Sequence, residues 1–188
     1  MLPTFQRAML VRRVRIGGVE LLPVTLAQAY CLYAWESPLV RGGTITPADF
    51  AVALWTCSQK CYPFESFSDA VTRGVPERKL ARLGKRYRMR RYGKDLAALR
   101  EWLGWHLSVP PRFMKQSASS GQPAAPWPMI VAVQLMPMVG EDRAWTMPVP
   151  QAMAYKIAMD NAQGDTSWKS EAEYEQGYAN GSNTQSGK

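Results

Sequence analysis

Apolar residues at helical spacing begin immediately after Thr25. In the run LAQAYCLYAW, residues 26–35, they recur at the i, i+3, i+4 and i+7 positions of one helix face. Thr25 followed three residues later by Gln28 is a capping-box pattern, which marks a helix start. Pro38 and then Gly42 and Gly43 interrupt the apolar pattern. We therefore expect a helix that starts at Thr25 and is ended by Pro38 and the two glycines.

A second apolar helix is predicted after this turn. Thr46 suits the N-cap, Pro47 suits the first helical position, and Asp49 lies in the first turn, where the helix dipole favours an anion. The run that follows is apolar at core spacing as far as Cys57. A helix that is apolar nearly all round is usually buried. We expect both helices to be enclosed by the rest of the chain or by a partner protein.

Two β-prone runs precede these helices. Residues 11–16 and 19–24 flank Gly17 and Gly18, and two residues that tolerate positive φ between such runs are typical of a β-hairpin. A lone hairpin is marginally stable, so we expect it to lie against the helices. A basic helix over residues 4–14 is the alternative interpretation.

The rest of the chain alternates between helical and linker-like patterns. Residues 76–107 carry apolar residues at helical spacing, and Gly93 favours two helices over one. Helices are also predicted over residues 129–139 and after Pro148, the latter with Ala152, Tyr155 and Met159 as its apolar stripe and Gly164 at its end. The predicted fold is mainly α, in four parts: a helical domain with an N-terminal β-hairpin (1–107), a Pro/Ser-rich flexible linker (108–128), a helical C-terminal segment (129–164) and an acidic, disordered tail (165–188).

Composition and charge narrow the classes of function. The chain has 188 residues, 46% of them apolar, and a net charge of +8. The N-terminus does not resemble a signal peptide and no apolar run is long enough to span a membrane, so we expect a cytoplasmic protein. With His106 as the single histidine, three cysteines and no recognisable catalytic motif, we expect no catalytic residues, no cofactor and no metal site. We therefore expect that this protein is not an enzyme.

The positive charge is concentrated in the segment from Arg78 to Lys94, which we call the basic segment. Tyr87 and Tyr92 are interleaved with the arginines and lysines of this segment, as phosphate contacts and base stacking would require. The alternative interpretation is a solvated basic face, or one that docks an acidic partner. The bases of this patch are Arg78, Lys79, Arg82, Lys85, Arg86, Arg88, Arg90, Arg91 and Lys94.

The segment after the linker is rich in methionine and tryptophan. Methionine-rich apolar surfaces adapt to different partners, so we predict a partner-binding surface in this segment. The alternative is that the segment folds back onto the N-terminal core. The predicted partner-binding residues are Trp145, Met147, Met153, Tyr155 and Met159.

Two groups of residues resemble a known family. The run from Leu26 through Ser37-Pro-Leu-Val-Arg-Gly-Gly43, followed by the helix that opens with Thr46-Pro-Ala-Asp49 and contains Cys57-Ser58, resembles small tail-assembly proteins of tailed bacteriophages and prophages. Trp145-Thr-Met-Pro148 before an Ala/Tyr helix resembles their C-terminal part. The resemblance covers residues 22–60 and 127–165 and does not include the basic segment.

This resemblance implies a non-enzymatic chaperone that holds phage tail components, the tape-measure protein or tail-tube subunits, in an assembly-competent state in the host cytoplasm. Two alternatives stay open. One is a structural or tail-completion protein that remains in the virion, and the other is a nucleic-acid-binding adaptor that uses the basic segment. The oligomeric state is open as well.

Overall fold

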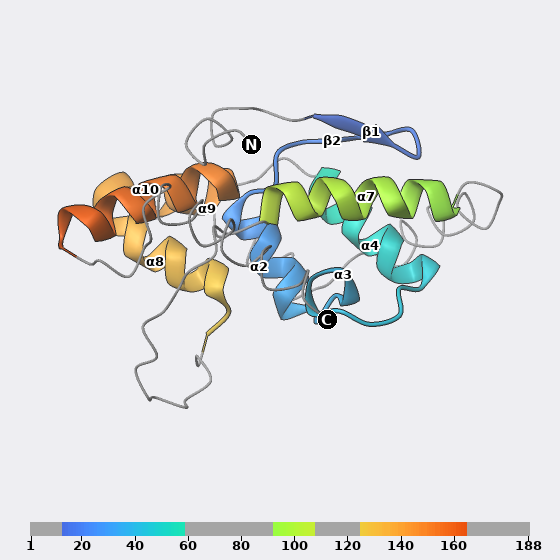
Figure 1. The fold of residues 1–188 in the computed structure, drawn as a ribbon, viewed down its shortest axis with the longest axis horizontal. Helices are drawn as coiled ribbons and strands as arrows, with labels where there is room; N and C mark the ends of the chain where they lie inside the picture. Colours follow the sequence, from blue (N-terminus) through green and yellow to red (C-terminus); the bar gives the residue numbers. More distant parts are fainter. Residues whose placement is uncertain (1–12, 59–91, 108–124, 165–188) are drawn as a thin grey trace, which may run out of the picture.

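The computed structural model describes residues 13–58, 92–107 and 125–164. Within these ranges the chain is mostly helical, with a small two-stranded antiparallel hairpin near the N-terminus, as the sequence predicts. Helix α2 (Leu26–Ala34) lies between two groups of elements (Figure 1). It packs on α4 (Pro47–Ser58) on one side and on the C-terminal helices on the other. The predicted enclosure of this apolar helix is therefore provided by the chain itself.

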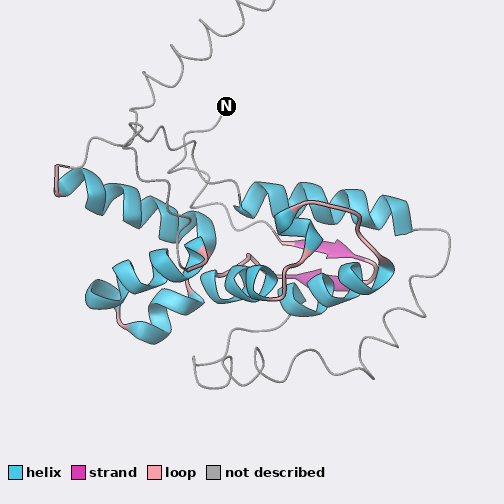
Figure 2. Ribbon diagram, turned by 90° about the horizontal axis from the view of Figure 1, so that it is seen from below, coloured by secondary structure: helices cyan, strands magenta, loops and turns pink. Residues whose placement is uncertain are grey.

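The hairpin forms where the glycine pair predicts it. Strands β1 (Val14–Ile16) and β2 (Val19–Leu21) pair in an antiparallel register, and Gly17 and Gly18 have φ angles of 56° and 81° between them. Both angles are readily adopted by glycine, which lacks a Cβ. Strand β1 contacts α7 and β2 contacts α4, so the hairpin covers the helices at one end of the molecule (Figure 2).

Helix α2 begins with the predicted capping box and ends earlier than predicted. The Thr25 hydroxyl accepts a hydrogen bond from the Gln28 N–H, and the Gln28 side-chain oxygen accepts one from the Thr25 N–H. The helix stops at Ala34, because Glu36 adopts a left-handed φ of 51° before Pro38 is reached. A separate four-residue helix, α3 (Pro38–Arg41), follows. The expected single turn thus contains an additional short helix.

The start of α4 also follows its local sequence. The Thr46 N–H and hydroxyl both donate to the Asp49 carboxylate, at 2.9 and 2.6 Å, and the Asp49 N–H donates back to the Thr46 hydroxyl. This reciprocal arrangement satisfies backbone groups that a helix start leaves without intrahelical partners. Deeper in the core, the Gln28 side-chain amide donates to the Thr56 carbonyl and joins α2 to α4.

Helix α7 (Tyr92–Leu107) covers the hairpin and part of α4. It starts next to the predicted break at Gly93 and buries Leu99, Trp102, Leu103 and His106, the predicted apolar stripe apart from the half-buried Leu96. The Tyr92 hydroxyl donates to the Ile45 carbonyl at 2.9 Å. Burial, together with the negative charge of Asp49, raises the pKa of Tyr92 and keeps its phenol neutral as a donor. Residues 76–91, which complete this predicted region, lie outside the described ranges.

Three helices form the C-terminal part: α8 (Trp127–Val139), α9 (Glu141–Thr146) and α10 (Val149–Ala162). The predicted linker boundary at residue 128 was wrong by two residues, because Trp127 and Pro128 already form the first turn of α8, where proline is tolerated. Helix α9 was not expected. Gly140, at a φ of 82°, ends α8 and allows the chain to turn into α9.

The starts of α2 and α10 are joined to each other. The Leu26 N–H donates to the Met147 carbonyl at 3.1 Å, and the Val149 N–H donates to the Val24 carbonyl at 2.8 Å. The first N–H of each helix therefore donates to a carbonyl that lies two residues before the start of the other helix. One hydrophobic core runs from the hairpin to α10. The residues that the sequence assigns to 1–107 and to 129–164 therefore share this core.

We expect Thr25→Ala to lower the free energy of unfolding by about 1–2 kcal/mol. The change removes the oxygen that accepts from the Gln28 N–H in a buried environment. Urea denaturation of the full chain measures the effect. Thr44→Ala, at an exposed position in the loop before α4, is the matched control and should leave the midpoint unchanged. Equal midpoints for the two variants would contradict the capping role.

Candidate protein-binding surface

Three of the five predicted partner-binding residues belong to the core. Trp145, Met147 and Met153 are each less than 5% exposed. The Trp145 ring makes an edge-to-face contact with the Tyr30 ring of α2, with centroids 5.5 Å apart. These side chains hold α9 and α10 against α2. They do not form a surface in this conformation, and the alternative that the segment folds back onto the core describes their position.

The other two predicted residues lie toward the outside of α10. Tyr155 is 44% exposed and Met159 is partly buried. Of the predicted stripe, Ala152 is buried whereas Tyr155 is exposed, so the three residues do not share one buried face. Tertiary contacts turn the helix so that Tyr155 points outward. The buried face of α10 consists of Val149, Ala152, Met153, Lys156, Ile157 and Asp160, with Ala154 at its edge.

Four of the five well-exposed large hydrophobic residues in the described ranges lie on α8. Only one side of this helix contacts α2, α9 and α10, while the other faces solvent. Val133 is 51% exposed and Met138 is 65% exposed. We call this surface the α8 outer face. It consists of Met129, Ile130, Val133, Pro137 and Met138, with Gln134 as its polar member.

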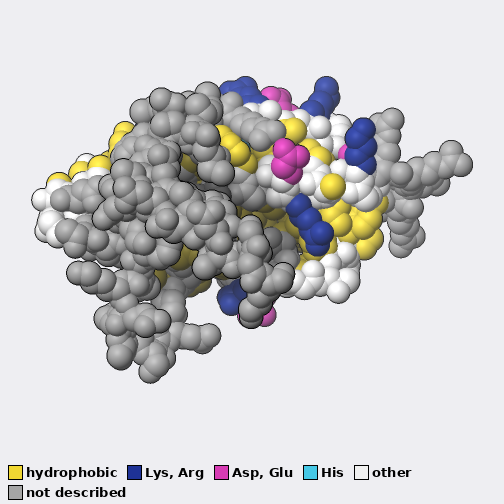
Figure 3. Space-filling view, viewed as in Figure 1, with side chains coloured by type: hydrophobic (Ala, Val, Ile, Leu, Met, Phe, Trp, Pro, Cys, Tyr) yellow, Lys and Arg dark blue, Asp and Glu magenta, His cyan; other side chains and the backbone are white. Residues whose placement is uncertain are grey.

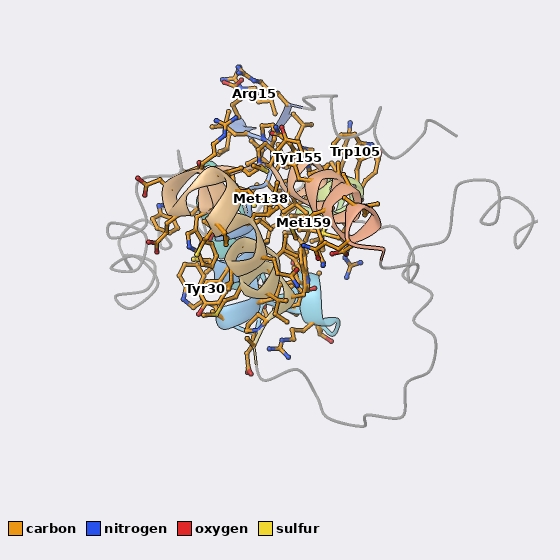
Figure 4. The ribbon with its side chains drawn as sticks, turned by 90° about the vertical axis from the view of Figure 1, so that its left-hand side faces the viewer. Arg15, Tyr30, Trp105, Met138, Tyr155 and Met159 are labelled. Atoms are coloured by element: carbon orange, nitrogen blue, oxygen red, sulfur yellow. The ribbon has the colours of Figure 1, made fainter. Side chains whose placement is uncertain are left out.

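Sequence reasoning missed the α8 outer face, although a signal for it was present. Gln134 is the single polar residue among the thirteen of α8. A helix with so few polar residues is usually buried on all sides. If one side of such a helix is exposed, it presents apolar residues to solvent. In the described part of the chain, however, every large hydrophobic residue that is well exposed lies on α8 or is Tyr155 of α10. Figure 4 looks onto this end of the molecule and labels Met138, Tyr155 and Met159 there.

One of the nine bases of the predicted basic patch lies within the described ranges. Lys94, in the first turn of α7, is exposed, whereas the eight other bases of the patch lie outside the described ranges. The described residues contain seven bases and eight acids. Charges of both signs lie among one another on the face shown in Figure 3. The part of the molecule that the structure describes is thus nearly neutral, although the whole chain carries +8.

A buried ion pair lies on the inner side of α10. The Lys156 ammonium contacts both Asp160 carboxylate oxygens, at 3.1 and 2.9 Å, and the two side chains are 6% and 8% exposed. Charged side chains are seldom buried this fully unless they are paired. The pair neutralises the only two charges of α10, so the helix contributes apolar and neutral groups to the interior.

The described side chains form no cluster suited to hold a metal ion. No group of three or more His, Cys, Asp or Glu residues is gathered within residues 13–58, 92–107 and 125–164. Cys31 and Cys57 are buried, and the His106 ring lies between the rings of Trp102 and Trp105 at 4.7 Å from each. His106 is therefore a packed residue. None of the helices in these ranges combines the length and apolarity needed to cross a membrane.

Comparison of the chain with protein-family models, with curated proteins and with solved structures finds no match in any of the three.

Proposed function

We propose that this protein is a non-enzymatic chaperone of bacteriophage tail assembly, which binds an apolar helical segment of a tape-measure protein or a tail-tube subunit. The observation that carries the proposal is the α8 outer face, an apolar surface on a folded helical scaffold. The family resemblance of the capped helices supports the same function. The binding residues differ from those predicted, because Trp145, Met147 and Met153 are buried and the α8 outer face is exposed.

The α8 outer face suits a helical client physically. Contiguous exposed apolar patches commonly mark interaction sites in soluble proteins. Methionine at both ends of this face, Met129 and Met138, adapts to side chains of different shape because it is unbranched. A client helix would lie along α8 in the helix-in-groove manner, with apolar side chains at i, i+3, i+4 and i+7 against it. Each large apolar side chain fully removed from water contributes about 1.5–3 kcal/mol.

We expect Met129→Ser combined with Met138→Ser to lower client capture by more than about tenfold, since the loss of two such contacts costs more than about 1.4 kcal/mol. Both side chains are exposed, so thermal unfolding of the variant should match that of the original chain. The measurement is co-purification of the co-expressed tape-measure protein and tail-tube subunit. The matched control is Ala158→Ser with Ala162→Ser, at exposed positions of α10. Undiminished capture by the methionine variant would rule out this face as the binding site.

The same proposal predicts where the protein is found after assembly. A chaperone leaves its client, so mass spectrometry should detect the protein in the lysate of infected or induced cells but not in purified phage particles. Stoichiometric presence in the particles would instead support a structural virion protein.

Nucleic-acid binding is the less favoured function. Within the described ranges Lys94 is the one base of the predicted patch, and it is exposed in the first turn of α7. The other eight bases, from Arg78 to Arg91, stay a prediction from the sequence.

A further inference from the structure

The α8 outer face reads nearly the same in both directions along the helix. Val133 lies midway between Trp127 and Val139, the two ends of α8. Two i, i+4 rows run along the exposed side, and such rows are the ridges by which helices pack together. The rows are Met129, Val133 and Pro137, and beside them Ile130, Gln134 and Met138. An apolar residue therefore stands near each end, with half-exposed Val133 at the centre.

An antiparallel arrangement of two copies brings the acids that follow one α8 beside the N-terminus of the other α8. Helix α8 has no charged residue, its first turn lacks an acid, and its N-cap makes no side-chain hydrogen bond. Glu141 and Asp142 are exposed just beyond its C-terminal end. In an antiparallel pair these acids lie beside the N-terminus of the partner's α8, where the helix dipole favours negative charge. Two copies therefore meet with Val133 at the centre, and the N-terminus of each α8 lies beside the acids that follow the α8 of the other copy.

We infer that, without a client, the α8 outer face is covered by a second copy of this chain in a symmetric antiparallel dimer whose two-fold axis passes beside Val133. The axis places Met129 of one copy against Pro137 of the other, as the isologous contact of a two-fold pair requires. A helix of thirteen residues is about 20 Å long, so the contact is smaller than a typical stable interface and the copies exchange readily. A client would compete with the second copy for this face, and this part of the inference rests on the function proposed above.

Sedimentation velocity of the full chain over a range of concentrations tests the dimer. The original chain should pass from monomer to dimer as concentration rises. Val133→Glu places two carboxylates against each other at the axis and should weaken association by more than about tenfold. Its helical circular dichroism should be unchanged, because Val133 is half exposed. The matched control is Ala97→Glu, which introduces the same charge at an exposed position of α7 and should leave association unchanged.

Two results would overturn the inference: a monomer at every concentration, or a Val133→Glu variant that associates as the original chain does. Glu141→Gln with Asp142→Asn provides a second test, because loss of the end charges should weaken the dimer and reduce its salt dependence. Client capture is measured separately. A dimer without client capture would overturn the proposed function alone, and a monomer that captures its client would overturn the dimer alone.

Discussion

Trp145→Ala is expected to lower the free energy of unfolding by about 3–5 kcal/mol, the usual range when a buried tryptophan is truncated. Trp145 is buried at the point where α9 meets α2, and its ring contacts the Tyr30 ring edge to face. Truncation removes this aromatic contact and leaves a cavity in a close-packed interior. Small domains are stable by only about 5–15 kcal/mol in total, so the variant should be close to the limit of folding.

Urea denaturation followed by circular dichroism measures this loss as a lower midpoint. Tyr155→Ala is the matched control, since it also truncates an aromatic residue of the C-terminal part but at a 44% exposed position. Its stability should change by no more than about 0.5 kcal/mol. A midpoint for Trp145→Ala equal to that of the control would show that the tryptophan is not part of the core. If the loss is found, weaker client capture by Trp145→Ala reports on folding and does not locate a binding site.

Lys156→Met should lower the free energy of unfolding by about as much as Trp145→Ala does. The substitution keeps the length of the side chain but leaves the buried Asp160 carboxylate without the ammonium group that contacts both its oxygens. Removing one partner of a buried ion pair typically costs about 3–5 kcal/mol, because the remaining charge stays desolvated. The expected result is a large fall in the urea midpoint.

The double variant Lys156→Met with Asp160→Leu separates the cost of removing the ammonium group beside Asp160 from the contribution of the ion pair to stability. Replacement of a buried pair by apolar residues of similar size is often neutral or stabilising. We therefore expect the double variant to recover most of the stability that the single variant loses. A double variant as unstable as Lys156→Met would indicate that the ion pair itself, or a further contact of Asp160, holds α10 in place.

Local patterns predicted several elements correctly because the interactions that form them span four residues or fewer. The Thr25 and Gln28 cap, the Thr46 and Asp49 hydrogen bonds and the glycine pair of the hairpin are all of this kind. The end of α2 was less predictable. A left-handed residue at Glu36 ended the helix before the proline that the sequence pattern emphasised.

Three of the five residues that the sequence predicts as a partner-binding surface lie in the core. Methionine and tryptophan content drew attention to Trp145, Met147 and Met153, which turned out to be core residues. Apolar content alone does not distinguish a residue that packs inside from one that faces solvent, since both α8 and α10 are rich in apolar residues. Of the predicted set, Tyr155 alone is well exposed.

The sequence by itself determined the mainly helical class, the hairpin turn and the starts of α2 and α4, because short-range backbone hydrogen bonds and φ preferences decide them. Only the tertiary structure decided which face of each C-terminal helix is buried. That choice depends on contacts across more than a hundred residues, such as Tyr30 with Trp145 and the hydrogen bond from Leu26 to Met147. The contacts of α8 with α2, α9 and α10 bury one side of this helix and leave the other side exposed as the α8 outer face.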